Sequence, residues 1–407
     1  MVRFLLFYQD DGIIISGMMD SMSIRPLLFF AIALPLCVPG FVLAQELQDR
    51  EEIVKARVTA ILLEEVRELP GLSLSTTYQT LEAEVLSGST KGNRVTVEND
   101  YLTLKEGDVF YAVYFASKSS GTEFYSVSEP YRLPMLAFFL ALFLLVTIMF
   151  GGRQGVRGLI ALALSFFFIG YILLPSILAG YSPTLVAIGV ASLIIITGSY
   201  ITHGINKTTS VAIVGMIITI LISGALAYLA LVWGQLTGFS SDESVYLNVA
   251  TSGNIDFAGL LFGAIIIGLL GVLYDAAIGQ AIAVEELARV GKNLSRRYIF
   301  DRALRIGREH IGALVNTLAI AYVGAALPLL LLFYALPLES IAATINRELF
   351  ATEIIRILIG STGVILSVPV TTALATLLLV KKGNSESVSD DGEDVPLPLR
   401  VHGHRHG

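Results

Sequence analysis

The chain has 407 residues, of which 54% are hydrophobic and only 15% are charged, whereas about a quarter of the residues in soluble domains are charged. Its formal net charge is −7 and it has no basic stripe with interleaved aromatic residues, which argues against nucleic-acid binding. Its single cysteine, Cys37, excludes an internal disulfide framework and a cysteine-built metal site.

Residues 1–44 form the predicted targeting segment. Arg25 precedes the apolar run 26–43, which ends in the small-residue site 42–44, as in a secretory signal peptide. The alternative is an uncleaved anchor helix. The start of translation is also open, and the candidate initiators are Met18, Met19 and Met22.

Residues 45–132 predict a small β-rich domain outside the membrane. Polar and apolar positions alternate or nearly alternate over 55–61 and 94–98, as they do in half-buried strands. Segments rich in Gly, Ser, Asn and Asp separate these runs and predict turns. Five short strands with such turns favour a small β-barrel of the OB type. No cluster of His, Cys or carboxylate side chains in this domain resembles a site.

The remaining region, residues 133–380, breaks into apolar runs of about twenty residues, the length that crosses ~30 Å of hydrocarbon. These runs predict an α-helical membrane bundle of about seven transmembrane helices. The predicted spans are 133–150, 156–178, 184–202, 210–232, 257–276, 311–334 and 354–380.

Basic residues are distributed unevenly among the loops between these spans. The loops 179–183, 233–256 and 335–353 contain one basic residue, Arg347. The alternate loops and the tail hold Arg153, Arg157, Lys207, Arg289, Lys292, Arg296, Arg297, Arg302, Arg305, Arg308, Lys381, Lys382, Arg400 and Arg405. This asymmetry predicts an extracytoplasmic β domain and a cytoplasmic C-terminus.

The C-terminal tail, residues 381–407, is polar and of mixed charge, so we expect it to be disordered and cytoplasmic. His402, His404 and His406 would bind a metal only loosely in such a segment, because nothing fixes their geometry. We therefore predict no metal site, and the sequence suggests no cofactor.

Polar side chains inside spans are costly in hydrocarbon and are candidates for function. Asp275 lies near the cytoplasmic end of the fifth predicted span, and Gln280 follows it by just over one turn. Asn316 and Thr317 lie near the same end of the sixth span, which Arg308 precedes. We predict that these five residues form an intramembrane cluster that handles protons or cations. The alternative is structural, with interhelical hydrogen bonds and an ion pair between Asp275 and Arg308.

A second candidate cluster lies near the opposite membrane face and consists of Asn346, Glu348, Glu353 and Arg356. Glu353 and Arg356 are i, i+3 neighbours on a predicted helix and are expected to pair. The alternative is that residues 339–352 form an interfacial amphipathic helix.

Motifs of membrane enzymes are incomplete in this sequence. Tyr274-Asp275 matches the first half of an intramembrane aspartyl protease pair, but no Gly-x-Gly-Asp follows in a later span. His-Glu-x-x-His and the phosphate-binding Gly-x-x-x-x-Gly-Lys are also missing, and no Gly-x-Ser-x-Gly is followed by a partner histidine within the membrane. We therefore expect no enzymatic activity, and intramembrane catalysis is the third hypothesis.

Several motifs of the membrane region support a more specific interpretation. They are 268–275 (Gly-Leu-Leu-Gly-Val-Leu-Tyr-Asp), 308–317, 327–331, 346–348, 353–356, 360–363 and 368–369. Together with 85–88 and 91–92 in the β domain and with Gly151-Gly152, they resemble the YibE/F family of bacterial multipass membrane proteins. The chain departs from the family pattern at Glu309, where aspartate is usual, and at Ile311, where methionine is usual. The resemblance implies a bacterial plasma-membrane location and a signal segment followed by a β domain, and it implies no activity.

The expected function is that of a permease or channel-like component for a small solute or ion. It is motivated by a multispan bundle that has polar residues at one depth and no energy-coupling ATPase motif. The alternative is an envelope assembly or scaffold protein whose β domain binds a partner while the bundle anchors it. The lipid bilayer is the first expected partner, and a second copy of the chain or a paralogous membrane subunit is the next candidate.

Overall fold

The computed structural model describes residues 50–68, 75–100, 102–116, 122–291, 294–335 and 340–380. The chain divides into two compact units between Val156 and Arg157. The predicted signal segment and the predicted C-terminal tail, with its three histidines, lie outside the described residues.

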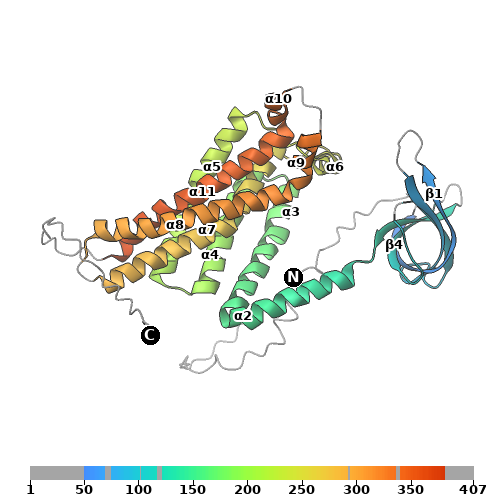
Figure 1. Cartoon of the computed structure of the whole chain (residues 1–407), viewed down its shortest axis with the longest axis horizontal. Coiled ribbons are helices and arrows are strands. Elements are labelled where there is room, and N and C mark those ends of the chain that lie inside the picture. Colours follow the sequence, from blue (N-terminus) through green and yellow to red (C-terminus); the bar gives the residue numbers. More distant parts are fainter. Residues whose placement is uncertain are drawn as a thin grey trace, which may run out of the picture. The chain divides into compact units, whose positions relative to one another are not determined.

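Five strands form a closed barrel in the N-terminal unit (Figure 1). They are β1 (Arg50–Glu68), β2 (Ser75–Val85), β3 (Arg94–Asn99), β4 (Val109–Ala116) and β5 (Glu123–Pro130). Their order around the barrel is β1-β2-β3-β5-β4, with β1 closing against β4 and with β3 and β5 as the parallel pair. The predicted small β-barrel is confirmed.

Successive side chains of a strand point to opposite sides, which separates the barrel interior from its surface. In β4 the side chains of Phe110, Ala112 and Tyr114 are buried, while their neighbours are more exposed. They pack with Val58 of β1 and Leu81 of β2 in one hydrophobic core.

Two polar side chains, Gln79 of β2 and Asn99 of β3, are also buried in the barrel. The Gln79 amide donates to the Leu104 carbonyl and accepts from the Leu104 N–H, each at 2.9 Å. Asn99 donates to the Gln79 oxygen at 3.0 Å and accepts from the Leu102 N–H at 3.1 Å. This network ties the segment that follows β3 to the barrel wall.

The rest of the described chain is helical. Its elements are α2 (Leu133–Phe168), the π-helical η1 (Ile169–Leu173), α3 (Leu174–Leu178), α4 (Pro183–His203), α5 (Lys207–Trp233), α6 (Asp242–Ala250), α7 (Phe257–Val290), α8 (Arg296–Ala325), α9 (Leu327–Ala335), α10 (Ile341–Ile345) and α11 (Glu348–Leu379). Asn206, Asp256 and Ser295 precede α5, α7 and α8, and each side chain accepts a backbone N–H of the first turn. These N-caps fix where the helices begin.

The membrane bundle is confirmed, and the count of its spans differs from the predicted seven. By length and composition, the described residues contain five helical segments that could cross a membrane, or six if a bent pair is one span. The predicted spans 133–150 and 156–178 fall within one 46-residue segment, Leu133–Leu178. At 1.5 Å per residue this segment measures roughly 70 Å, about twice the hydrocarbon thickness. Gly152 interrupts it with a non-helical backbone (φ 51°, ψ −137°), so the segment contains both predicted runs.

The sixth predicted span, 311–334, is a broken one. It corresponds to the end of α8 and to α9, which are bent by 66° relative to each other. Pro328 at the start of α9 has no N–H to continue the hydrogen-bond ladder of α8. Pro369 lies inside α11, which nevertheless continues to Leu379.

In the C-terminal unit α11 packs against α5, α7 and α8 (Figure 1). Along α5 and α11 the contacts are made by small residues. Gly215 of α5 lies against Thr371 of α11, and Ser223 of α5 lies against Gly363 of α11. The numbers rise along one helix as they fall along the other, so the two helices are antiparallel. Small residues at such positions let helix backbones approach closely.

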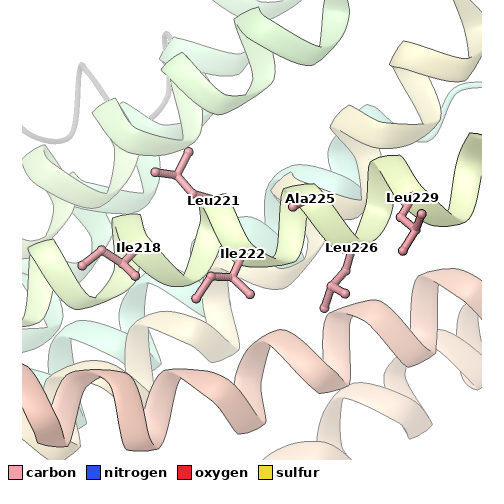
Figure 2. Close-up of a pocket in the computed structure, with 6 residues that line it drawn as sticks. All are labelled: Ile218, Leu221, Ile222, Ala225, Leu226 and Leu229. Carbon is pink, nitrogen blue, oxygen red and sulfur yellow. The ribbon is translucent and has the colours of Figure 1, made fainter.

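An apolar groove of about 460 Å³ follows the exposed side of α5 (Figure 2). It is lined by Ile218, Leu221, Ile222, Ala225, Leu226 and Leu229. A surface of this composition in the middle of a span is suited to lipid chains. It offers no polar group to a solute and therefore is not the candidate site.

Candidate functional site

A polar cavity of about 300 Å³ lies where the end of α4, the beginning of α5 and the C-terminal part of α7 meet. The residues that line it are His203, Asn206, Thr208, Thr209, Ile278, Ala281, Ile282 and Glu285. Five of them carry polar side chains, in a bundle whose other contacts are mainly apolar.

The turn between α4 and α5 places the polar groups of one wall. Gly204 ends α4 with a positive φ of 78°, which favours glycine because it has no Cβ. Asn206 then caps α5 by accepting the Thr209 N–H at 2.7 Å. This cap directs Thr208 toward α7, where its hydroxyl donates to Oε2 of Glu285 at 2.7 Å.

Glu285 supplies the acidic group of the opposite wall. Its other oxygen accepts from Arg289 at 3.2 Å, and the neighbouring Glu286 pairs with the same arginine at 3.1 Å. Only Glu285 lines the cavity, and it is the less exposed of the two glutamates. The adjacent pair therefore contains one carboxylate at the cavity and one at the surface.

Asp275 lies deeper along α7, on the same helical face as Ile278, Ile282 and Glu285. It is close enough to His203 for the two groups to interact electrostatically. The preceding Tyr274 contacts α4, where its hydroxyl forms a hydrogen bond with the Thr202 hydroxyl. The rings of Tyr274 and His203 are 5.8 Å apart. The predicted candidate Asp275 is thus associated with the polar cavity through a histidine.

The other predicted members of this cluster lie elsewhere. Gln280 is buried and accepts from the Thr372 hydroxyl of α11 at 2.8 Å. Thr317 is exposed and donates to the Ala313 carbonyl of its own helix at 2.9 Å, and Asn316 and Arg308 are exposed on α8. Of the five predicted residues, only Asp275 is associated with the cavity, through its interaction with the lining residue His203, and the ion pair between Asp275 and Arg308 is not among the described ones.

The reason for this difference is helical rotation. Leu318 and Tyr322 face the neighbouring helices, because Gly360 of α11 lies against both. Asn316 precedes Leu318 by two residues, a rotation of about 200° at 3.6 residues per turn. Asn316 therefore does not lie on the face of α8 that contacts the neighbouring helices, although its predicted depth in the membrane is similar to that of Asp275.

The model of the family described as YibE/F-like protein matches residues 139–381, which is more than half of the chain and includes the cavity. The chain belongs to the YibE/F family. No curated protein and no solved structure matches this chain.

The sequence of this YibE/F-like protein did not reveal any of the five polar residues that line the cavity, which are His203, Asn206, Thr208, Thr209 and Glu285. The predicted fifth span ends at residue 276, whereas α7 continues to Val290. Charged residues after residue 276 suggested a loop, although Glu285 and Arg289 have the i, i+4 spacing of a helix-stabilising pair. That spacing was the available signal for a longer helix.

The second predicted cluster is divided between two places. The expected ion pair of Glu353 and Arg356 is present, with Nη1 and Oε1 2.9 Å apart. Glu348 lies elsewhere and accepts from the backbone N–H groups of Thr237 and Gly238, each at 2.7 Å. Asn346 is exposed and ends α10.

The hypothesis of one amphipathic helix over residues 339–352 is wrong. Among the described residues, this range contains the short α10 (Ile341–Ile345) and the start of α11 at Glu348. Arg347 between them has ψ 137°, an extended conformation that separates the two helices.

Proposed function

We propose that this protein is a permease or channel-like component that moves a small solute or ion across the bacterial plasma membrane, with the polar cavity as its binding site. The observation that supports the proposal best is the cavity itself, which Glu285 and His203 line within a membrane bundle and which Asp275 approaches through its interaction with His203. Ionisable groups in such a bundle are costly, and they commonly mark substrate or proton pathways.

The polar groups of the cavity suit binding and proton exchange. Glu285 has a carboxylate that keeps hydrogen bonds to Thr208 and Arg289, and Asn206 and Thr209 add neutral polar groups. His203 also lines the cavity, and histidine is a common proton carrier in proteins. No covalent chemistry is part of this proposal, in agreement with the incomplete enzyme motifs of the sequence.

Flux measurements on reconstituted protein test the proposal. We expect liposomes that contain the protein and a pH-sensitive dye to show proton or solute flux above that of empty liposomes. Glu285→Gln removes the cavity charge at constant volume and is expected to reduce the flux by roughly tenfold or more, since a hydrogen bond to a charged group contributes about 1.5–3 kcal/mol. Asp275→Asn is expected to act in the same direction.

The matched control is Glu286→Gln, which removes the neighbouring carboxylate and its contact with the same Arg289 but lies outside the cavity. It should leave the flux near the wild-type level. Flux equal to that of empty liposomes for a panel of ions and small solutes would contradict the proposal, as would equal effects of the two glutamine variants.

We also propose that the cavity end of the bundle is cytoplasmic and that the β-barrel domain is exported behind a signal segment. The distribution of basic residues supports this orientation. Cysteines introduced at Ser241 and Ser340 are expected to react with a membrane-impermeant maleimide in intact spheroplasts. A cysteine at Ser295, the N-cap of α8, is expected to react only after permeabilisation. Labelling of Ser295 from outside would overturn the proposed orientation.

A further inference from the structure

The break between α8 and α9 lies in a part of the bundle remote from the polar cavity. The two helices are bent by 66° around Ala326, and Pro328 cannot donate a hydrogen bond to the Gly324 carbonyl. Interrupted helices at membrane depth are tolerated where they are buried in protein or line a cavity, and in transporters they often adjoin binding sites.

Tyr322 lies one turn before this break and reaches two other helices. Its hydroxyl oxygen contacts the backbone at Gly268 of α7, where a Cβ would collide with it. Its ring lies against Gly360 of α11. The same tyrosine is close enough to Glu353 and Arg356 to interact with both electrostatically.

Arg356 uses only part of its hydrogen-bonding capacity. Its Nη1 donates to both oxygens of Glu353, at 2.9 and 3.2 Å. Its Nε is buried and has no hydrogen-bond partner among the described residues, and the hydrogen bonds seen there for this side chain come from Nη1 and not from Nη2. These two groups lie side by side on the guanidinium and form the fork that binds a carboxylate or a phosphate through two parallel hydrogen bonds.

Two hydroxyl groups near this fork are also buried without a hydrogen-bond partner among the described residues. They are those of Tyr322 and Thr352. Thr352 is only 1% exposed and lies one turn before Arg356, on the same face of α11. Polar groups that are buried without partners destabilise a fold. Here a charged guanidinium is one of them, together with hydroxyl groups of Tyr322 on α8 and Thr352 on α11.

We propose that Arg356, Tyr322 and Thr352 form a binding site for an oxyanionic group, a carboxylate or a phosphate. Glu353 neutralises the arginine through Nη1 and leaves the Nε–Nη2 fork for the ligand, while the two hydroxyl groups supply further hydrogen bonds. The site is built from α8 and α11, whereas the polar cavity is built from α4, α5 and α7. The inference concerns binding and does not require that the protein transports the ligand.

Thermal unfolding of the full-length protein in a neutral detergent tests this site. Acetate and inorganic phosphate are titrated against chloride at constant ionic strength, and phosphatidylglycerol is added in a separate arm to test a lipid headgroup as the source of the oxyanion. A saturable rise of the unfolding temperature is expected with an oxyanion and not with chloride. Arg356→Lys keeps the positive charge and loses the Nε–Nη2 fork. We therefore expect the oxyanion concentration at half-saturation to be at least about tenfold higher than for the wild type.

Tyr322→Phe removes a single oxygen and retains the ring that packs on Gly360, so it keeps the test valid if the arginine variant folds poorly. It is expected to weaken binding several-fold. Arg347→Gln removes an exposed arginine at the N-cap position of α11, whose side chain makes no capping hydrogen bond, and should leave binding unchanged. Saturation only by the lipid, lost in the Arg356 and Tyr322 variants, would support the site with a headgroup as its ligand. Equal stabilisation of all variants, or of the wild type by chloride, would overturn the proposal.

Discussion

Replacing Gly215 with valine is expected to lower the free energy of unfolding of the helical unit by about 3 kcal/mol or more. A Cβ at this position would lie 2.5 Å from Oγ1 of Thr371 and 3.3 Å from its Cα. The hydroxyl could rotate away, but the backbone of α11 would also have to move. Because α11 packs against three helices, that movement would disturb more than one interface. The unfolding temperature in detergent should fall by roughly 10 °C.

The matched control is Gly271→Val on α7, where a Cβ meets nothing within 4 Å. It introduces the same side chain and the same change of helix propensity without the contact. A second test is compensation, in which Gly215→Ala is combined with Thr371→Gly to exchange the small and the larger residue across the interface. An unfolding temperature of the valine variant equal to that of its control would show that α5 and α11 do not approach as closely as described.

Replacing Gln79 with leucine is expected to destabilise the β-barrel by about 4 kcal/mol, because several buried partners lose their hydrogen bonds at once. The Leu104 N–H and carbonyl, the Asn99 amide and Glu64 all bond to this one side chain. The leucine would fill most of the volume and would satisfy none of these groups. A small domain has only about 5–15 kcal/mol of stability, so the loss is a large share of it.

Hydrogen exchange of the intact protein measures this effect locally. Amides of β2, β3 and the segment around Leu104 should exchange much faster in the leucine variant, whereas those of the bundle should not change. Thr80→Val is the control, since Thr80 is the next residue of β2 and points to the opposite side of the strand. Equal protection in the two variants would mean that the buried network contributes little to the barrel.

The sequence predicted the elements whose signal is periodic and local. Alternating polarity in β3 and the turn segments around it predicted the barrel, and apolar runs of sufficient length predicted the spans. Helix ends were predicted less well where polar residues continue a helix. The α7 helix extends fourteen residues beyond the predicted end at 276, and the cavity depends on that extension.

The candidate sites show why similar depth in the membrane does not predict which residues of different helices are in contact. Asp275 and Asn316 were grouped because both are a similar number of residues from one membrane face, but the partner near Asp275 is His203 of α4. The pairing of Glu353 with Arg356 was predicted because it depends only on spacing within one helix. Contacts between helices depend on rotation and packing, which a single sequence does not specify.

The hydrogen bonds of Glu348 restrict how α5 and α11 can move relative to each other. Its carboxylate accepts from three donors, the N–H groups of Thr237 and Gly238 and the Thr237 hydroxyl, which lies within 3.0 Å of both carboxylate oxygens. These bonds join the first residue of α11 to the segment that follows α5, and separating the two helices at this end would break them together. At the other end, Thr208 of α5 donates to Glu285 of α7, and Arg296 of α8 donates through Nε and Nη2 to the carbonyl of Val380, which follows α11. There the ends of α5 and α11 are bonded to α7 and α8, whereas at Glu348 the bonds run directly between α11 and the segment after α5. Glu348 therefore restricts the separation of α5 from α11 most directly.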